Sequence, residues 1–120
     1  MAEPATCIAS AMPAAPALNR RHLARMTLGD RALERELLEL FDRQAVILLA
    51  RMRDADAISL SALAHTLKGS ASGIGAGTVA NAARAVEQAA SPAEQAAAVE
   101  DLAAAIAVLR AVIAPLLRES

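Results

Sequence analysis

The sequence predicts an all-α protein: an antiparallel up-down four-helix bundle with a short extra N-terminal helix. Composition gives the first indication, because 33 of the 120 residues are Ala and 16 are Leu, and both have high helix propensity. Aromatic residues, which favour strands, are reduced to a single Phe. Finally, apolar residues from Leu18 onward recur at steps of three or four, which is the period of an α-helix.

The N-terminal segment differs from the rest of the chain. Residues 1–17 contain three of the five prolines and no apolar periodicity, so we expect a flexible tail followed by one helical bundle domain over 18–120. The single cysteine, Cys7, falls in this tail and is given no role. One thiol forms neither an internal disulfide nor a thiolate metal site.

Charge and hydropathy exclude several classes of protein. Twelve basic and thirteen acidic residues give a net charge of −1, which argues against a dedicated nucleic-acid binder. No uncharged apolar run approaches the ~20 residues that a membrane helix requires. The N-terminus carries Glu3 and no early Lys or Arg, unlike a secretory signal. We therefore expect a cytoplasmic monomer that binds neither nucleic acid nor membrane.

The first two helices are predicted as follows. A short helix covers about 18–26 and ends near 27–29, after which Asp30 caps the next helix with its carboxylate. That second helix runs to about Arg53, and its second half, 45–50, is apolar on nearly every side, so we expect it to be the most buried helix of the bundle. Its buried stripe is predicted to contain Leu33, Leu37, Leu40, Phe41, Leu48 and Met52.

Three further helices follow a turn at 54–56. One runs from about 57 to 72 and is broken by Gly73, Gly75 and Gly77. Another covers about 78–90, and the last begins at Ser91-Pro92-Ala93-Glu94, a typical N-cap and capping-box sequence. Pro115 should bend or loosen the end of the last helix. The inward residues are predicted to be Val79, Ala82, Val86 and Ala89 in the first of this pair, and Val99, Leu102, Ile106, Leu109, Ile113 and Leu116 in the second.

The helix over 57–72 carries the residues of greatest chemical interest. Its predicted core stripe is Leu60, Leu63, Leu67, Ala71 and Ile74, and at 100° per residue His65 lies about 160° from both Leu63 and Leu67. His65 should therefore face solvent. Its neighbours on that face are Ser61, Lys68, Gly69 and Ser72.

Two details make this face unusual, and one excludes a metal site. Gly69 sits in mid-helix, where Gly costs ~0.8–1 kcal/mol relative to Ala, so its missing side chain suggests room for an approaching partner. Lys68 is the only lysine beside eleven arginines, and its ammonium is a compact charge that suits a phosphoryl group. No second metal ligand is near, because the other histidine, His22, lies on a different helix.

The segment His65-Thr66-Leu67-Lys68-Gly69-Ser70-Ala71, followed by Ile74-Gly75-Ala76, resembles the signature of the histidine-containing phosphotransfer (HPt) domains of bacterial two-component phosphorelays. The segments 36–41 and 82–90 resemble the helices on either side in that family. About 28–91 is covered well, the last helix matches in character only, and the tail does not match.

The resemblance implies that His65 accepts a phosphoryl group from a receiver-domain phospho-aspartate and passes it to another receiver aspartate. Lys68 would offset negative charge, and Gly69 would let the receiver approach. Ser61, Ala62, Ala64 and Ser72 would contact the partner or the phosphate. The expected partners are response-regulator receiver domains, including that of a hybrid histidine kinase. The chain itself would hold no cofactor or metal, since Mg²⁺ belongs to the receiver, and would be a phosphocarrier without ATP-dependent kinase activity.

Alternative interpretations remain open at this stage. A histidine-kinase dimerisation domain also displays a histidine on a helix, but in that family an acidic residue usually follows the histidine and a Pro comes soon after. Here Thr66 follows His65, and the first Pro after His65 is Pro92. A non-catalytic scaffold bundle would leave His65 inert. A helical DNA-binding module is disfavoured by the charge, although Arg20, Arg21 and Arg25 cluster on the first helix.

Overall fold

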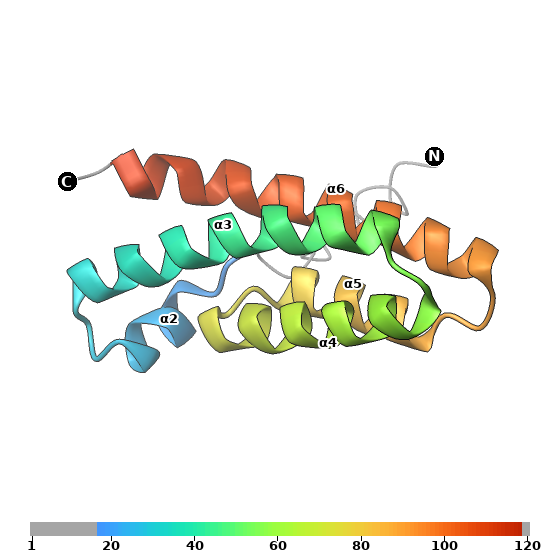
Figure 1. The fold of residues 1–120 in the computed structure, drawn as a ribbon. Helices are drawn as coiled ribbons and strands as arrows, with labels where there is room; N and C mark the ends of the chain where they lie inside the picture. Colours follow the sequence, from blue (N-terminus) through green and yellow to red (C-terminus); the bar gives the residue numbers. More distant parts are fainter. Residues whose placement is uncertain (1–16, 119–120) are drawn as a thin grey trace, which may run out of the picture.

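The computed structural model describes residues 17–118, and within them it contains five α-helices and no strand (Figure 1). Residues 1–16, which hold most of the expected tail and Cys7, lie outside the described part. The helices are α2 (Arg20–Met26), α3 (Arg31–Asp54), α4 (Ala57–Ile74), α5 (Gly77–Gln88) and α6 (Pro92–Arg118).

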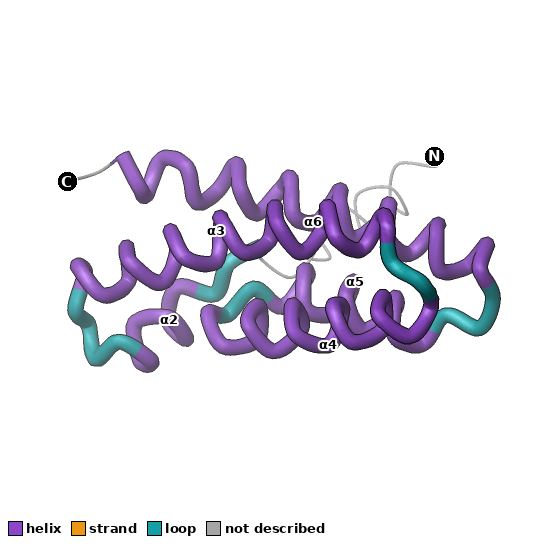
Figure 2. The backbone as a smooth tube through the Cα atoms, viewed as in Figure 1, coloured by secondary structure: helices purple, strands orange, loops and turns teal. Residues whose placement is uncertain are grey.

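The four longer helices form the predicted up-down bundle. Each packs antiparallel to its neighbour in sequence, and α6 returns beside α3 to close the ring (Figures 1 and 2). The loops between them are short, as Figure 2 shows. Helix α4 is thus held between α3 and α5, which leaves one long face of α4 uncovered.

The caps predicted from sequence are present, and others accompany them. The Asp30 carboxylate accepts a hydrogen bond from the Leu33 amide at 3.1 Å, and the Ser91 hydroxyl accepts one from the Glu94 amide at 3.1 Å. Asp56 caps α4 in the same way, 2.8 Å from the Ser59 amide. These side chains satisfy amides that have no partner within the first helical turn.

Helix α2 docks against the end of α4. The Asn19 amide donates to the Gly75 carbonyl at 2.8 Å, and His22 Nε2 lies 3.2 Å from the Gly73 carbonyl oxygen. Gly75 has φ +85°, and a Cβ there would lie 2.8 Å from the Asn19 oxygen. Gly75 therefore ends α4 with the left-handed residue of a Schellman turn, in which the Ala76 amide bonds back to the Ala71 carbonyl.

The apolar spacing of α6 predicted its core almost completely. Its first five predicted inward residues are buried, and Leu116 is partly buried against the same core. Pro115 lies inside the helix, which continues to Arg118, so the proline does not end it.

The predicted stripe of α3 is partly wrong. Leu33 and Leu40 are exposed, whereas Leu38 and Ala45 are buried in their place. The expectation that this helix would be the central, most buried one because of its apolar half at 45–50 is also wrong, because Val46 and Ile47 are about half exposed. Helix α3 has only α4 and α6 as close neighbours, so an apolar sequence on all sides does not make it central.

Smaller corrections concern the two following helices. Helix α4 extends to Ile74 and passes through Gly73, since the break occurs at Gly75 rather than at the first glycine of the series. In α5, the buried alanines are Ala80 and Ala83, while Ala82 and Ala89 are half-buried. Small alanines give little contrast between neighbouring faces, so their pattern fixes a helix orientation poorly.

Candidate functional site

His65 lies on the uncovered face of α4. The buried residues of this helix, among them Leu60, Leu67 and Ala71, point into the bundle, and the histidine lies on the opposite side. Its side chain is 70% exposed. The predicted orientation of His65 is therefore confirmed.

One ring nitrogen of His65 is held by a carboxylate from the neighbouring helix. His65 Nδ1 lies 3.0 Å from Glu87 Oε2, across the α4–α5 contact. An ionised carboxylate only accepts hydrogen bonds, so Nδ1 carries the hydrogen in this contact and donates it. The neutral imidazole then has its lone pair on Nε2, the nitrogen that does not face Glu87.

Lys68 uses the other oxygen of the same carboxylate. Its Nζ lies 3.0 Å from Glu87 Oε1, and both side chains are largely buried, at 27% and 19% exposure. The ammonium is one helical turn after His65, so the carboxylate joins the two residues of α4 to each other. His65, Lys68 and Glu87 thus form a three-residue cluster on the surface of α4 and α5.

The pKa of the Glu87 carboxyl depends on its burial and on its contacts with Lys68 and His65. Its burial favours the neutral acid and by itself raises the pKa, but the opposing contacts with Lys68 and His65 are stronger in sum. The pKa of Glu87 therefore lies below its ordinary value of 4.5. Near neutral pH the group is a carboxylate, as the contact with His65 Nδ1 requires.

This lowered pKa predicts how stability depends on pH. The stabilisation that Glu87 provides is fully present above about pH 4.5, the ordinary value, and is lost as the pH falls through the lower pKa of the folded protein. We expect Glu87→Gln to lower the urea midpoint at pH 7, and the difference from wild type to shrink at pH 3. The control is Glu100→Gln. This residue pairs with Arg53 at a more exposed position, 67% for the Glu100 side chain, where an ion pair contributes little. An equal loss at both pH values for Glu87→Gln would contradict the interpretation.

The remaining predicted residues divide into two groups. Ala62, Gly69 and Ser72 are exposed beside His65, and Ser61 is half-buried. A Cβ added at Gly69 would meet no atom within 4 Å. The expectation that Ala64 is exposed and contacts the partner is wrong, because Ala64 is 0% exposed and belongs to the core.

Glu87 is the site residue that the sequence prediction missed. It is the single acidic residue of α5, next to the inward-facing Val86, and this isolated charge beside a buried position was the available signal. The distance of 22 residues from His65 conceals the contact. His22 lies elsewhere, against the end of α4, and does not join the cluster.

The described residues contain neither a cluster of metal ligands nor a helix that could span a membrane. Within 17–118, no three His, Cys, Asp or Glu side chains gather as metal ligands would. None of the helices in this part of the chain combines the length and apolar character needed to cross a membrane.

Comparisons with known proteins show the family and a similar fold. Residues 30–118 match the protein family described as Hpt domain. The fold is similar to the crystal structure of a rice protein proposed to be a histidine-containing phosphotransfer protein. The TM-score is 0.78 at 17% sequence identity, with 97% of this chain and 90% of that chain covered. No match was found among curated proteins.

Proposed function

The chain belongs to the Hpt domain family, and from this we propose that His65 is its phosphoryl acceptor and donor in a phosphorelay. The single observation that carries the proposal is the orientation of His65, whose Nδ1 lies 3.0 Å from Glu87 Oε2 while the side chain is 70% exposed on an open helix face. The bacterial setting of the relay stays a prediction of the sequence resemblance.

The proposed step is a direct transfer at Nε2. The Nε2 lone pair attacks the phosphorus of an aspartyl phosphate on a receiver domain, the N–P bond forms, and the P–O bond to the aspartate breaks. The aspartate leaves as a carboxylate, and no proton has to be removed from Nε2. The same bond changes in reverse pass the group to the next receiver. In-line positioning supplies most of the acceleration in such reactions.

Glu87 has a defined part in this step. Positive charge develops on the imidazole ring as Nε2 forms its new bond, and the hydrogen on Nδ1 then faces a carboxylate at 3.0 Å. A charge-assisted hydrogen bond is roughly twice as strong as a neutral one. Glu87→Gln keeps an acceptor but removes the charge, so we expect it to slow phosphoryl acceptance about tenfold, a loss of ~1.4 kcal/mol.

Lys68 would neutralise part of the negative charge of the incoming phosphoryl group while it keeps its ion pair with Glu87. Its Nζ is one helical turn from the ring and already partly dehydrated. The receiver would bring its own Mg²⁺, so Lys68 supplies a second, weaker neutralisation of charge. The chain contributes no cofactor to this reaction.

The partner would dock along one row of α4. Ile58, Ala62, His65, Gly69 and Ser72 recur at steps of three or four and are all exposed, with Ile58 the most prominent apolar side chain of the row. A row of one apolar and several small residues permits close, transient contact with a receiver domain.

Ala62→Arg tests this surface. The side chain of Ala62 is exposed one turn before His65, so we expect an Arg there to slow transfer at low receiver concentration while the melting temperature changes little. Ala104→Arg is the matched control, because Ala104 is an exposed alanine of α6, a helix that packs against α3 and α5. If the Ala62→Arg variant and the wild type transferred at equal rates, the receiver would have to bind at another surface.

The function itself is tested by incubation with purified phosphorylated receiver domains. We expect a label on the chain that is labile in acid and stable in base, the behaviour of a phosphoramidate. No label from any receiver would favour an inert scaffold bundle. Label obtained from ATP alone would favour a kinase.

A further inference from the structure

One outer face of α3 carries a regular row of apolar residues. Leu33, Leu40 and Ile47 recur at steps of seven residues, and they are 39%, 55% and 53% exposed. Seven residues are close to two helical turns, so the three side chains lie nearly one above another. Leu37 and Gln44, both partly buried, lie between them and complete a heptad pattern, which is typical of a helix that packs along another helix. We call these five residues the α3 ridge.

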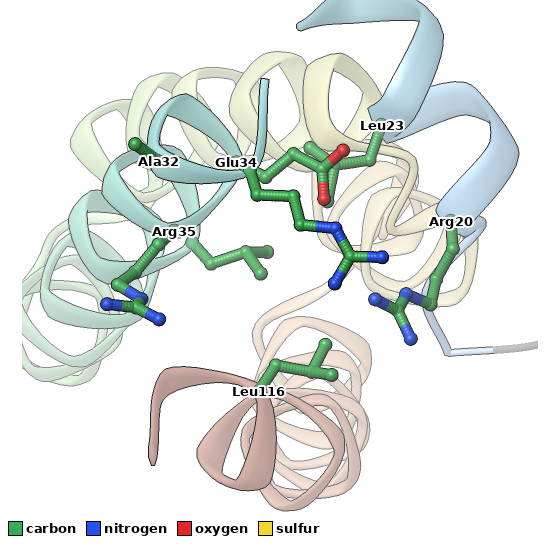
Figure 3. Close-up of a pocket in the computed structure, with 8 residues that line it drawn as sticks. Arg20, Leu23, Ala32, Glu34, Arg35 and Leu116 are labelled. Atoms are coloured by element: carbon green, nitrogen blue, oxygen red, sulfur yellow. The ribbon is translucent and has the colours of Figure 1, made fainter. Parts of the chain in front are cut away.

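The α3 ridge lies along the outside of its own bundle. The other side of α3 borders a hollow of about 400 Å³, which Leu23 of α2 and Leu116 of α6 also line (Figure 3). None of the five ridge residues lines this hollow. The buried residues of α3, such as Leu38 and Ala45, are on the inner side as well. The ridge is therefore an apolar helix face that the bundle formed by residues 17–118 leaves open.

A groove continues from the ridge toward α4. Leu37, Leu40 and Gln44 form one wall of this groove, which has a volume of about 320 Å³. Ser70 and Gly73 of α4 lie on its other side. Because these two residues are small, they leave room for a helix of another molecule to lie against the ridge.

The charges beside the ridge change sign along the helix. Glu36 and Arg43 are both exposed, and their spacing of seven residues places them on the same side of the ridge, the side away from α4. Two copies of α3 that ran in the same direction would bring like charges together. Two antiparallel copies would instead place each Glu36 beside the Arg43 of the other copy, and such flanking pairs select partner and orientation.

The antiparallel arrangement also matches the apolar residues. A two-fold axis between Leu37 and Leu40 places Leu37 of one copy opposite Leu40 of the other, and Leu33 opposite Gln44. The paired segment then covers residues 31–46 of α3, or about 24 Å of helix. A contact of this length is at the small end of specific interfaces, so the dimer should be weak.

We propose that this protein forms a two-fold antiparallel dimer in which the α3 ridges of two copies pack together, with Glu36 and Arg43 paired across the axis. The self-complementary order of the two charges is what points to a second copy of the chain as the occupant. None of these residues belongs to the row of α4 around His65, so the inference does not depend on the function proposed for that histidine. It replaces the monomer expected from the sequence.

Sedimentation equilibrium of the full chain measures this association. We expect the average mass to rise from 12.3 kDa toward twice that value as the concentration increases, with a Kd of about 10–100 µM. Leu40→Glu should weaken the dimer at least tenfold, because it places a charge at the centre of the apolar contact. Val108→Glu, at an exposed position of α6, should leave the Kd unchanged. A chain that stays monomeric at about 1 mM, or equal weakening by both variants, would overturn the proposal.

Charge reversal tests the direction of the two helices. Glu36→Arg and Arg43→Glu should each weaken self-association at least tenfold, because like charges then face each other at both ends of the contact. An equimolar mixture of the two variants should recover the wild-type Kd, since every pair across the axis again joins opposite charges. Failure of the mixture to associate would contradict the antiparallel dimer.

Matched variants on other helices control for net charge. Asp101→Arg in α6 and Arg84→Glu in α5 make the same changes of charge at exposed positions. Each of these variants should dimerise alone as the wild type does. If they instead lost and recovered association like the α3 variants, overall charge rather than the α3 ridge would govern the mass, and the proposal would be wrong.

Discussion

His65→Gln is expected to abolish phosphoryl acceptance from a receiver domain while leaving the fold intact. The side chain is 70% exposed, so its replacement opens no cavity, and surface substitutions of this kind change stability by about 0.5 kcal/mol or less. Gln can still accept or donate near Glu87, but it has no nucleophilic nitrogen. The measurements are transfer of label and the melting temperature by circular dichroism.

His22→Gln is the control for this prediction. His22 contacts the Gly73 carbonyl and packs at the end of α4, so its loss can loosen α2 but should leave transfer intact. If His65→Gln still accepted the phosphoryl group, or if it unfolded, the assignment of His65 would be wrong.

Gly69→Leu is expected to have the second largest effect on transfer. A Cβ at Gly69 would meet no atom within 4 Å, so nothing inside the bundle requires glycine there. The row that contains Gly69 is where the receiver would approach, and a misplacement of about 1 Å in such a step costs about 100-fold in rate. We therefore expect single-turnover transfer to slow about 100-fold.

Gly69→Ala separates the effect of this position on the stability of the free protein from its effect on the rate of phosphoryl transfer. In the free protein, helix propensity alone should stabilise it by ~0.8–1 kcal/mol, which raises the melting temperature by about 3–5 °C for a domain of this size. Transfer should slow, but less than for Leu. A Gly69→Leu protein that accepts phosphate at the wild-type rate would leave the mid-helix glycine without the purpose assigned to it.

Lys68→Ala should behave differently from both glycine variants. It removes charge without adding bulk, and the cation of the receiver carries much of the neutralisation. We expect a smaller loss of rate than for Gly69→Leu. Some destabilisation should accompany it, because Glu87 would keep only His65 as a partner.

The fold was predictable where the sequence carries strong local signals. The regular spacing of α6 places large apolar residues such as Leu102 and Leu109 on one face, and the caps at Asp30 and Ser91 are local contacts. Prediction failed where all faces look alike. The run Ala45–Ala50 gave no polar side to mark solvent, so the exposure of Val46 and Ile47 had to be found in the structure.

The candidate site was predictable for α4 alone. Helical geometry places His65, Lys68 and Gly69 correctly, but it does not state the width of the buried stripe, so Ala64 was assigned to the wrong side. Glu87 lies on α5, and its contact depends on how α4 and α5 pack. His65 and Glu87 are 22 residues apart and lie on different helices, so their contact follows from the tertiary fold and cannot be predicted from residue spacing within one helix.

The most direct test of the central claim is to identify the phosphorylated atom. The chain, labelled with ¹⁵N on histidine, is phosphorylated by a receiver domain, and its imidazole nitrogens are observed by long-range ¹H–¹⁵N NMR. Before transfer, we expect the hydrogen of His65 on Nδ1. After transfer, we expect coupling to phosphorus at His65 Nε2 and unchanged signals from His22. Phosphorus on Nδ1 of His65, on His22 or on no histidine would contradict the account.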